Sequence, residues 1–321
     1  MKKHNERILI TGGAGFIGSH YLNRFVLRYP ETLFVNVDCL TYASDLKNIS
    51  VAEASNYRFH KVDIRDRDAL EKVFAEHTPT GVINFAAESH VDLSIENPSI
   101  FVETNIVGTH NLLVLARAHG IKRFHQISTD EVYGSLAKDA PPFTTRSPIA
   151  PNSPYSASKA AADMLARSYH RTFGLNVVIS RCSNNYGPHQ DTSKIIPKFI
   201  VALLKGEKVP LYAKGENIRD WLYVEDHVEA IDLIFRKGEN GCVYNVGGGE
   251  ELSNIELTRR LLALTERDES FIQEVADRPG HDFRYASDNS ELSRELGWKP
   301  RHRLEEGLQK TFAFYKNKVG S

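Results

Sequence analysis

Tyr155 and Lys159 stand four residues apart, which is the spacing of one helical turn. Ser153 and Pro154 are favoured residues at the start of a helix, so Tyr155 and Lys159 are expected to share one helix face. A tyrosine ordinarily ionises near pH ~10, but an ammonium group beside it favours the phenolate. Such a pair is more often only a solvated surface pair. Beside a reacting hydroxyl group it would form a general base.

Thr129, Asp130 and Glu131 follow a predicted strand at residues 124–129. Ligands of open α/β sheets bind beyond the carboxyl ends of the strands, so a substrate is expected near these side chains. Two carboxyl groups can supply one acid and one base, the pair that an elimination requires. The same acids could equally form a solvated strand exit or a helix cap. Their position shortly before Tyr155 favours a site.

A glycine-rich turn joins the predicted strand at residues 7–11 to the helix at residues 16–28. Its three glycines suit a tight turn, the close approach of a pyrophosphate, and the packing of the helix on the strand. Phosphate charge would lie against free N–H groups of the first helical turn, at Phe16 and Ile17. The glycines are Gly12, Gly15 and Gly18.

Asp38 ends the next predicted strand, and an acid at this position can accept hydrogen bonds from the adenosine ribose. It also repels a 2′-phosphate, which predicts NAD in preference to NADP. Asp63 and Ile64 are expected along the adenine ring, and Ala86 and Ala87 are expected to let the cofactor approach closely. Tyr155 and Lys159 would then lie at the nicotinamide, with the lysine also holding its ribose.

Alternating apolar and amphipathic segments predict a Rossmann-type, doubly wound parallel sheet of the α/β class. Residues 1–183 are expected to form the NAD-binding domain, joined by part of 225–250. Residues 184–321 are expected to form a smaller α/β domain that binds the substrate. The expected strands are 7–11, 33–38, 58–63, 81–87, 124–129, 176–183, 209–212 and 221–224. The expected helices are 16–28, 66–76, 98–119, 154–173, 195–205, 228–236, 255–265 and 304–317.

The composition excludes several classes of protein. Forty basic and forty-one acidic residues leave a net charge of −1, so no nucleic-acid-binding or membrane-binding surface is expected. No apolar run approaches the ~20 residues of a membrane span, and no apolar signal region stands at the N-terminus. The three cysteines have neither disulfide-framework nor zinc-ligand spacing. We therefore expect a cytoplasmic protein without a metal site.

Together these residues resemble the extended short-chain dehydrogenase/reductase superfamily, and within it the dTDP-glucose 4,6-dehydratase family. The resemblance covers almost the whole chain and is most specific at Thr129, Asp130 and Glu131. It also implies that Leu40 and Thr41 contact NAD. The matching segments are 38–43, 86–92, 124–134, 155–159, 181–188, 217–221 and 278–282.

The resemblance implies a cycle in which a tightly bound NAD is regenerated at each turnover. Tyr155, helped by Thr129 and Lys159, would remove the proton of the sugar C4 hydroxyl while C4 is oxidised. Glu131 would then remove the acidified C5 proton, and Asp130 would protonate the departing C6 hydroxyl. Hydride return to C6 completes a dehydration to the 4-keto-6-deoxy sugar.

The resemblance also implies a set of substrate-binding residues and a homodimer. Ser89, His90 and Ser94 would lie near the sugar, and Asn184 and Arg219 at the diphosphate. The dimer would form through helices near residues 98–119 and 154–173. Further nucleotide-side contacts are implied for Lys194, Pro210, Tyr212, Asn254, Arg278 and His281.

The chain departs from the family pattern at Cys39, where lysine is common, at Leu93, where arginine is common, and in a short segment between Tyr133 and Ser147. Two rivals remain at this stage. Another NAD-dependent nucleotide-sugar enzyme, such as a UDP-sugar 4,6-dehydratase, an epimerase or a decarboxylase, would share the C4 oxidation. A non-catalytic NAD-binding regulator would keep the glycine turn alone. The sequence does not decide between thymine and uracil, which differ by one methyl group.

Overall fold

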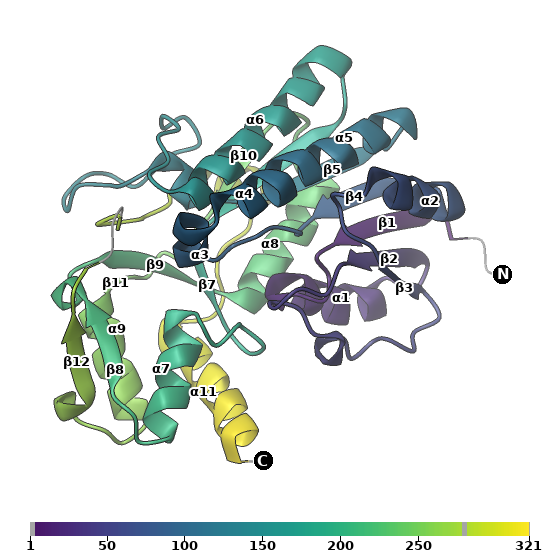
Figure 1. Cartoon of the computed structure of the whole chain (residues 1–321). Helices are drawn as coiled ribbons and strands as arrows, with labels where there is room; N and C mark the ends of the chain where they lie inside the picture. The colour runs from purple at the N-terminus through teal and green to yellow at the C-terminus, as the bar shows by residue number, and fades with distance from the viewer. Residues whose placement is uncertain (1–3, 278–280, 321) are drawn as a thin grey trace.

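The computed structural model describes residues 4–277 and 281–320 and is built on a seven-stranded parallel sheet (Figure 1). The strand order is β10-β6-β5-β4-β1-β2-β3, which confirms the predicted doubly wound fold. The strands are β1 (Glu6–Thr11), β2 (Thr32–Asp38), β3 (Tyr57–Lys61), β4 (Gly81–Asn84), β5 (Arg123–Thr129), β6 (Val177–Cys182) and β10 (Val243–Val246).

Helices cover both faces of this sheet, because apolar side chains project from both of its faces. Ile8 and Ile10 of β1 pack in one core with the helices α1 (Phe16–Arg28) and α8 (Val224–Lys237). Leu9, between them, packs in the other core. That second core is covered by α2 (Arg67–His77), α5 (Thr109–Ala118) and α6 (Pro154–Phe173). In Figure 1, α5 and α6 lie side by side on one face of the sheet.

The helix expected over residues 98–119 is interrupted. It begins as α4 (Pro98–Phe101), continues as a π-helical stretch (Val102–Gly108) and ends as α5. A π-helical turn accommodates an extra residue, and such turns occur often at functional sites. Here the stretch carries Asn105, which is buried.

A second, smaller layer packs around its own core. The strands β7 (Asn184–Tyr186), β9 (Ile218–Tyr223) and β11 (Glu251–Ser253) form one small sheet, and β8 (Val209–Tyr212) pairs with β12 (Ile272–Val275). The helices α7 (Ile195–Leu204), α9 (Asn254–Leu264) and α11 (Leu304–Gly320) contribute to the apolar core beneath these strands. This layer forms the separate lower lobe that carries β8, β12 and α11 in Figure 1.

Several boundaries and short elements differ from the sequence expectation. The strand expected at 81–87 ends at Asn84, and the next residues leave the sheet to line the cavity described below. The strand expected at 221–224 runs over Ile218–Tyr223. The sequence did not indicate the short helices α3 (Val91–Glu96) and α10 (Ser290–Leu296). Within the described residues, no helix is both long and apolar enough to cross a membrane.

Candidate active site

The glycine turn between β1 and α1 is closely packed at two of its three glycines. Gly12 has a φ of +69°, and a Cβ there would lie 2.7 Å from the backbone nitrogen of Ala86. A Cβ at Gly18 would lie 2.4 Å from the carbonyl oxygen of Gly12. A Cβ at Gly15 would lie 3.3 Å from the carbonyl oxygen of Gly12, so the packing around Gly15 excludes a side chain less strongly than at Gly12 and Gly18. Gly15 lines a cavity at the start of α1, where backbone N–H groups suit a phosphate.

This cavity has a volume of about 350 Å³ and lies at the carboxyl ends of the parallel strands, next to the second layer. It brings together nearly all the residues predicted to bind NAD and all five predicted catalytic residues. They are Gly12, Gly15, Phe16, Ile17, Gly18, Asp38, Thr41, Asp63, Ile64, Ala86, Ala87, Thr129, Asp130, Glu131, Tyr155 and Lys159. Leu40 is not part of the lining, but its N–H donates to Asp38 Oδ1 at 2.8 Å.

Asp38 is held in place by two backbone groups. Its second carboxylate oxygen accepts a hydrogen bond from Ala14 N at 2.9 Å, so the end of β2 is fixed against the glycine turn. At the end of the neighbouring strand, Arg65 Nη2 lies 2.7 Å from Asp63 Oδ2. Burial opposes ionisation of Asp63, but Arg65 outweighs it and lowers the pKa of this carboxyl. The residues present therefore fit an adenosine ribose at Asp38, with Asp63 and Arg65 beside the adenine.

The residues after β5 turn sharply toward the cavity. Asp130–Tyr133 form one turn of 3₁₀ helix, and Thr129 Oγ1 caps it by accepting from Glu131 N at 3.3 Å. The same hydroxyl lies 3.5 Å from Asp130 Oδ1. This cap places both carboxyl groups within one turn of the strand end, at the cavity.

Asp130 is fully buried, and its surroundings favour the protonated carboxylic acid. Burial raises the pKa of its carboxyl well above the usual range, and the negative charges of Glu131 and Asp220 raise it further. Arg219 and a hydrogen bond from Ser287 oppose the shift; Ser287 Oγ is 3.4 Å from Asp130 Oδ2. A neutral carboxylic acid at neutral pH can donate a proton to a leaving hydroxyl group.

Tyr155 and Lys159 lie on the first turns of α6, where Ser153 caps the helix and Pro154 begins it. Lys159 Nζ donates to Ile127 O at 2.6 Å, and burial lowers its pKa while Asp163 raises it. The structure differs from the sequence expectation in one respect. Burial, followed by the charge of Glu131, raises the pKa of Tyr155 well above its usual range, and a hydrogen bond with Thr129 opposes this shift only in part. The protein groups alone therefore keep Tyr155 as a phenol.

Two buried hydrogen-bond networks fix α6 relative to the site. Asn105, on the π-helical stretch, accepts from Glu88 N at 2.8 Å and donates to Ser158 Oγ at 2.8 Å. Ser158 Oγ in turn donates to the carbonyl oxygen of Tyr155 at 2.7 Å. Asn105 thus joins the loop after β4 to the helix that carries Tyr155.

The second network is an ion pair between α6 and β6. Arg181 Nε lies 2.9 Å from Asp163 Oδ2, and both side chains are buried. Arg181 also donates to the hydroxyl of Tyr133, which donates to Asn245 of β10 at 2.8 Å. The turn after β5, the helix α6 and the last strand of the sheet are therefore connected through side chains.

Besides Thr129, three residues predicted to contact substrate line the cavity, namely Ser89, Asn184 and Lys194. Lys194 Nζ donates to the carbonyl oxygen of Ser89 at 2.8 Å, which links the second layer to the loop after β4. Asn184 Oδ1 is buried and has no hydrogen-bond partner among the described residues. Ser128 Oγ, also in the lining, shares this property. Buried polar atoms in native proteins normally have partners, so these two suit a polar ligand.

The other residues predicted for the substrate do not line this cavity, as far as they belong to the described part of the chain. His90 accepts from Leu93 N and caps α3, while Ser94 is buried and donates to Val91 O. Pro210 and Tyr212 lie on β8. Arg278 lies outside the described residues.

Three further predicted residues, Arg219, Asn254 and His281, belong to the second layer. Arg219 pairs in register with Leu252, beside the start of α9 at Asn254. Its guanidinium donates to Asp282 O at 2.9 Å and stacks on Tyr285. His281 Nδ1 lies 2.7 Å from Asp277 Oδ1.

Several residues of the site were missed by sequence reasoning, and all of those named here except Asn105 line the cavity. Arg65 follows Asp63 by two positions, and a basic residue just after a strand-end acid is a signal that could have found it. Asn105 gives no local signal, because its role depends on contacts with segments far away in the chain. The remaining lining residues that were not predicted include Ala43, Ser44, Glu88, Ile100, Thr104, Asn185, Gln190 and Asp191.

Known proteins are similar to this chain over almost its full length. Residues 9–311 match the family described as GDP-mannose 4,6 dehydratase. The dTDP-glucose 4,6-dehydratase of Neisseria meningitidis serogroup B is 47% identical over 97% of this chain and 93% of the relative. The dTDP-glucose 4,6-dehydratase 1 of Escherichia coli K12 is 44% identical, over 96% of this chain and 92% of the relative.

Solved structures agree with these relatives. DesIV, the dTDP-glucose 4,6-dehydratase of Streptomyces venezuelae solved with NAD bound, is 45% identical with a TM-score of 0.94, and the match covers 98% of each chain. The UDP-glucose 4-epimerase of Thermotoga maritima, solved with UDP-glucose, is 31% identical with a TM-score of 0.91, over 98% of this chain and 99% of the other. The resemblance predicted from the sequence is confirmed. The chain belongs to the GDP-mannose 4,6 dehydratase family, whose model it matches over residues 9–311, and to the family of the dTDP-glucose 4,6-dehydratases.

Proposed function

We propose that this chain is an NAD-dependent hydro-lyase that converts dTDP-glucose to dTDP-4-keto-6-deoxyglucose. The observation that carries the proposal is the buried acid Asp130, held protonated beside Glu131 and within the same cavity as Tyr155. An epimerase or a decarboxylase needs C4 oxidation but no acid for a C6 hydroxyl. The dTDP-glucose 4,6-dehydratases at 44% to 47% identity support the same reaction.

The cavity suits NAD along its whole length. The N-terminus of α1 would hold the pyrophosphate, Asp38 the adenosine ribose, and Lys159 the nicotinamide ribose. When bound, the dinucleotide accepts a hydride from C4 of the sugar and returns one to C6. Its positive nicotinamide would also favour the phenolate of Tyr155, which the protein groups alone do not.

The side chains at the strand ends would carry out the proton transfers. Tyr155, hydrogen-bonded to Thr129, would remove the proton of the C4 hydroxyl. Once C4 is a ketone, the C5 hydrogen becomes acidic, and Glu131 would remove it. Asp130 would give its proton to the C6 hydroxyl, which leaves as water. Two carboxyl groups with different protonation states are what this elimination requires.

The substrate contacts follow from the same proposal. Ser89, Asn184 and Lys194 line the cavity and would contact the sugar and the diphosphate, with His90 and Ser94 supporting the sugar side. Residues 184–321 would bind the nucleotide through Pro210, Tyr212 and the second-layer residues Arg219, Asn254 and His281. Arg278 belongs to the same proposal. Residues 1–183, with part of 225–250, would bind NAD, since β10 completes the parallel sheet.

Incubation of the purified protein with dTDP-glucose, without added NAD, tests the proposal. Mass spectrometry should show loss of one water, and borodeuteride should label the new ketone at C4. Product formed only after NAD is added would keep the reaction but contradict tight retention of the cofactor. An unchanged dTDP-glucose with NAD present, together with turnover of UDP-glucose, would overturn the assigned substrate.

A further inference from the structure

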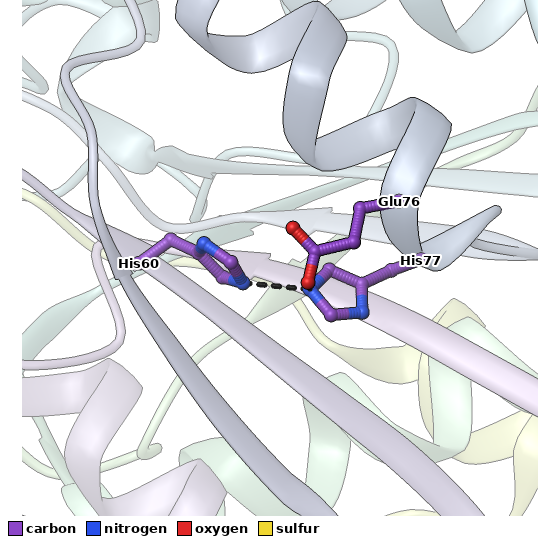
Figure 2. A group of neighbouring side chains, drawn as sticks. All are labelled: His60, Glu76 and His77. Carbon is purple, nitrogen blue, oxygen red and sulfur yellow. Dashed lines mark hydrogen bonds and ion pairs between the residues drawn. The ribbon is translucent and has the colours of Figure 1, made fainter.

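Two histidines and a glutamate meet on the surface between the edge strand β3 and the end of α2 (Figure 2). His60 Nε2 lies 2.6 Å from His77 Nε2, and His77 Nε2 lies 3.4 Å from Glu76 Oε1. His60 comes from the strand, whereas Glu76 and His77 are the last two residues of the helix. The two histidines are 17 residues apart in the chain, so sequence spacing gave no sign of the group.

Hydrogen bonds alone do not give each of these three atoms a good partner. A neutral imidazole nitrogen carries either a hydrogen or a lone pair, and a carboxylate oxygen carries only lone pairs. A proton on His60 Nε2 leaves the lone pairs of His77 Nε2 and Glu76 Oε1 facing each other, and a proton on His77 Nε2 must be shared between two acceptors. One cation at the centre would satisfy all three lone pairs at once.

We propose that His60, His77 and Glu76 bind a divalent transition-metal ion, of which Zn²⁺ is the reference case. Zinc accepts imidazole nitrogen and carboxylate oxygen at about 2.0–2.2 Å, with four ligands in a tetrahedron. Its ligand atoms are then about 3.3 Å apart. The three atoms already lie within 4.8 Å of one another, so side-chain rotations of the two rings suffice. Water would fill the fourth position, because Glu76 lies at the surface.

The types of ligand atom narrow the choice of metal. The imidazole pair selects against Mg²⁺ and Ca²⁺, which prefer ligand sets made only of oxygen.

The position of the site indicates a structural role. None of the three residues lines the NAD cavity, so the ion would take no part in the dehydration. The site joins β3 to the last turn of α2, and the connection between these elements carries Asp63, Ile64 and Arg65, which do line the cavity. A bound ion would therefore fasten the edge strand to the helix that follows it.

Metal titration of the holoenzyme tests the proposal. Protein without a histidine tag is treated with EDTA, dialysed, and titrated with Zn²⁺ against a chelating indicator, with no nucleotide added beyond the NAD that the protein retains. We expect one equivalent of Zn²⁺ to bind, with at least tenfold weaker binding in His60→Gln and in His77→Gln. Glu76→Gln, at an exposed position, should weaken binding by a smaller factor. Absence of stoichiometric binding, or equal affinity in wild type and His60→Gln, would overturn the proposal.

His119→Gln provides a matched control. His119 Nε2 lies 2.8 Å from the carboxylate of Glu71, but His119 does not belong to the three-residue group. This variant should bind Zn²⁺ as the wild type does, and loss of the bound equivalent would place the ion elsewhere. Co²⁺ gives a second readout that needs no variant. Intense visible absorption of four-coordinate Co²⁺ supports the site, and the weak spectrum of six-coordinate Co²⁺ contradicts it.

Discussion

At the scale of single residues, the proposed chemistry depends on the different environments of two neighbouring carboxyl groups, Asp130 and Glu131. Asp130 is enclosed and keeps its proton, whereas the Glu131 side chain is only partly buried. The turn after Thr129 places both side chains at the cavity but encloses only that of Asp130. Substitutions of these groups should therefore separate the steps of the reaction.

We expect the double variant Asp130→Asn/Glu131→Gln to oxidise C4 and then stop before water is lost. Bound NADH should accumulate and appear as absorbance in a stopped-flow experiment with dTDP-glucose. The variant Tyr155→Phe is the matched comparison, because it lacks the hydroxyl that would accept the C4 proton and should form no NADH. Normal turnover by the double variant would contradict the roles proposed for the two acids.

Asp220 gives a prediction for pH and stability. Burial raises its pKa from an ordinary 3.8 to about 6, although backbone N–H groups of Gly248 and Glu250 stabilise the carboxylate. Because the folded-state pKa is raised, the cost of ionisation is absent below pH ~4, grows between pH ~4 and ~6, and persists above. The rise in pKa from 3.8 to about 6 lowers the free energy of unfolding by about 3 kcal/mol once the carboxyl is ionised.

The variant Asp220→Asn lacks this titration. We expect the free energy of unfolding of the wild type to fall by about 3 kcal/mol relative to the variant between pH ~4 and ~7. Urea denaturation at several pH values measures the difference. A difference that stays constant with pH would show that Asp220 ionises normally in the folded protein.

At the scale of elements, α6 is the part of the structure on which the site most depends. It carries Tyr155 and Lys159, and its orientation is fixed by Asn105 from one side and by the pair of Asp163 with Arg181 from the other. A buried ion pair contributes little net stability, but removal of one partner leaves an uncompensated charge in the interior.

We expect Asp163→Ala to lower the free energy of unfolding by about 3–5 kcal/mol. Glu269→Ala is the control, because Glu269 pairs with Arg259 at the surface with both side chains more than half exposed. That exposed pair should contribute no more than about 1 kcal/mol. Chemical denaturation of both variants measures the contrast, and equal losses would contradict the assigned effect of burial.

The elements that the sequence predicted are those with a local cause. The glycine turn, the end of β2 at Asp38 and the start of α6 at Ser153 each follow from residue types within a few positions. The interruption at Val102–Gly108 does not, since the same residue types could continue an α-helix and the contacts that Asn105 makes there are with segments far along the chain. The direction of Arg219, toward the carbonyl oxygens near residue 282, was likewise set by a segment far along the chain.

At the scale of the whole molecule, two neighbouring helical segments expose apolar side chains. The π-helical stretch and α6 present Val102, Val107, Met164 and Phe173 at the surface. They lie on the helices through which the family resemblance implies a homodimer. An apolar face on paired helices suits an interface between two copies of the chain.

We expect the protein to be a dimer in light scattering after size-exclusion chromatography. Val107→Glu combined with Met164→Glu should convert it to a monomer, because each charge would be buried without a partner at the interface. Leu27→Glu, at an exposed apolar residue of α1, is the control and should remain a dimer. A monomeric wild type, or an unchanged dimer in the double variant, would contradict this interface.

The strand β10 has a consequence for how the chain is made. The ribosome completes six strands of the parallel sheet by Cys182, but the seventh, which pairs with β6, begins only at Val243. During the intervening synthesis one edge of β6 has no strand beside it, and an open edge can pair with other chains. A sheet that formed before residue 243 was made would therefore be one strand short, with β6 at its edge.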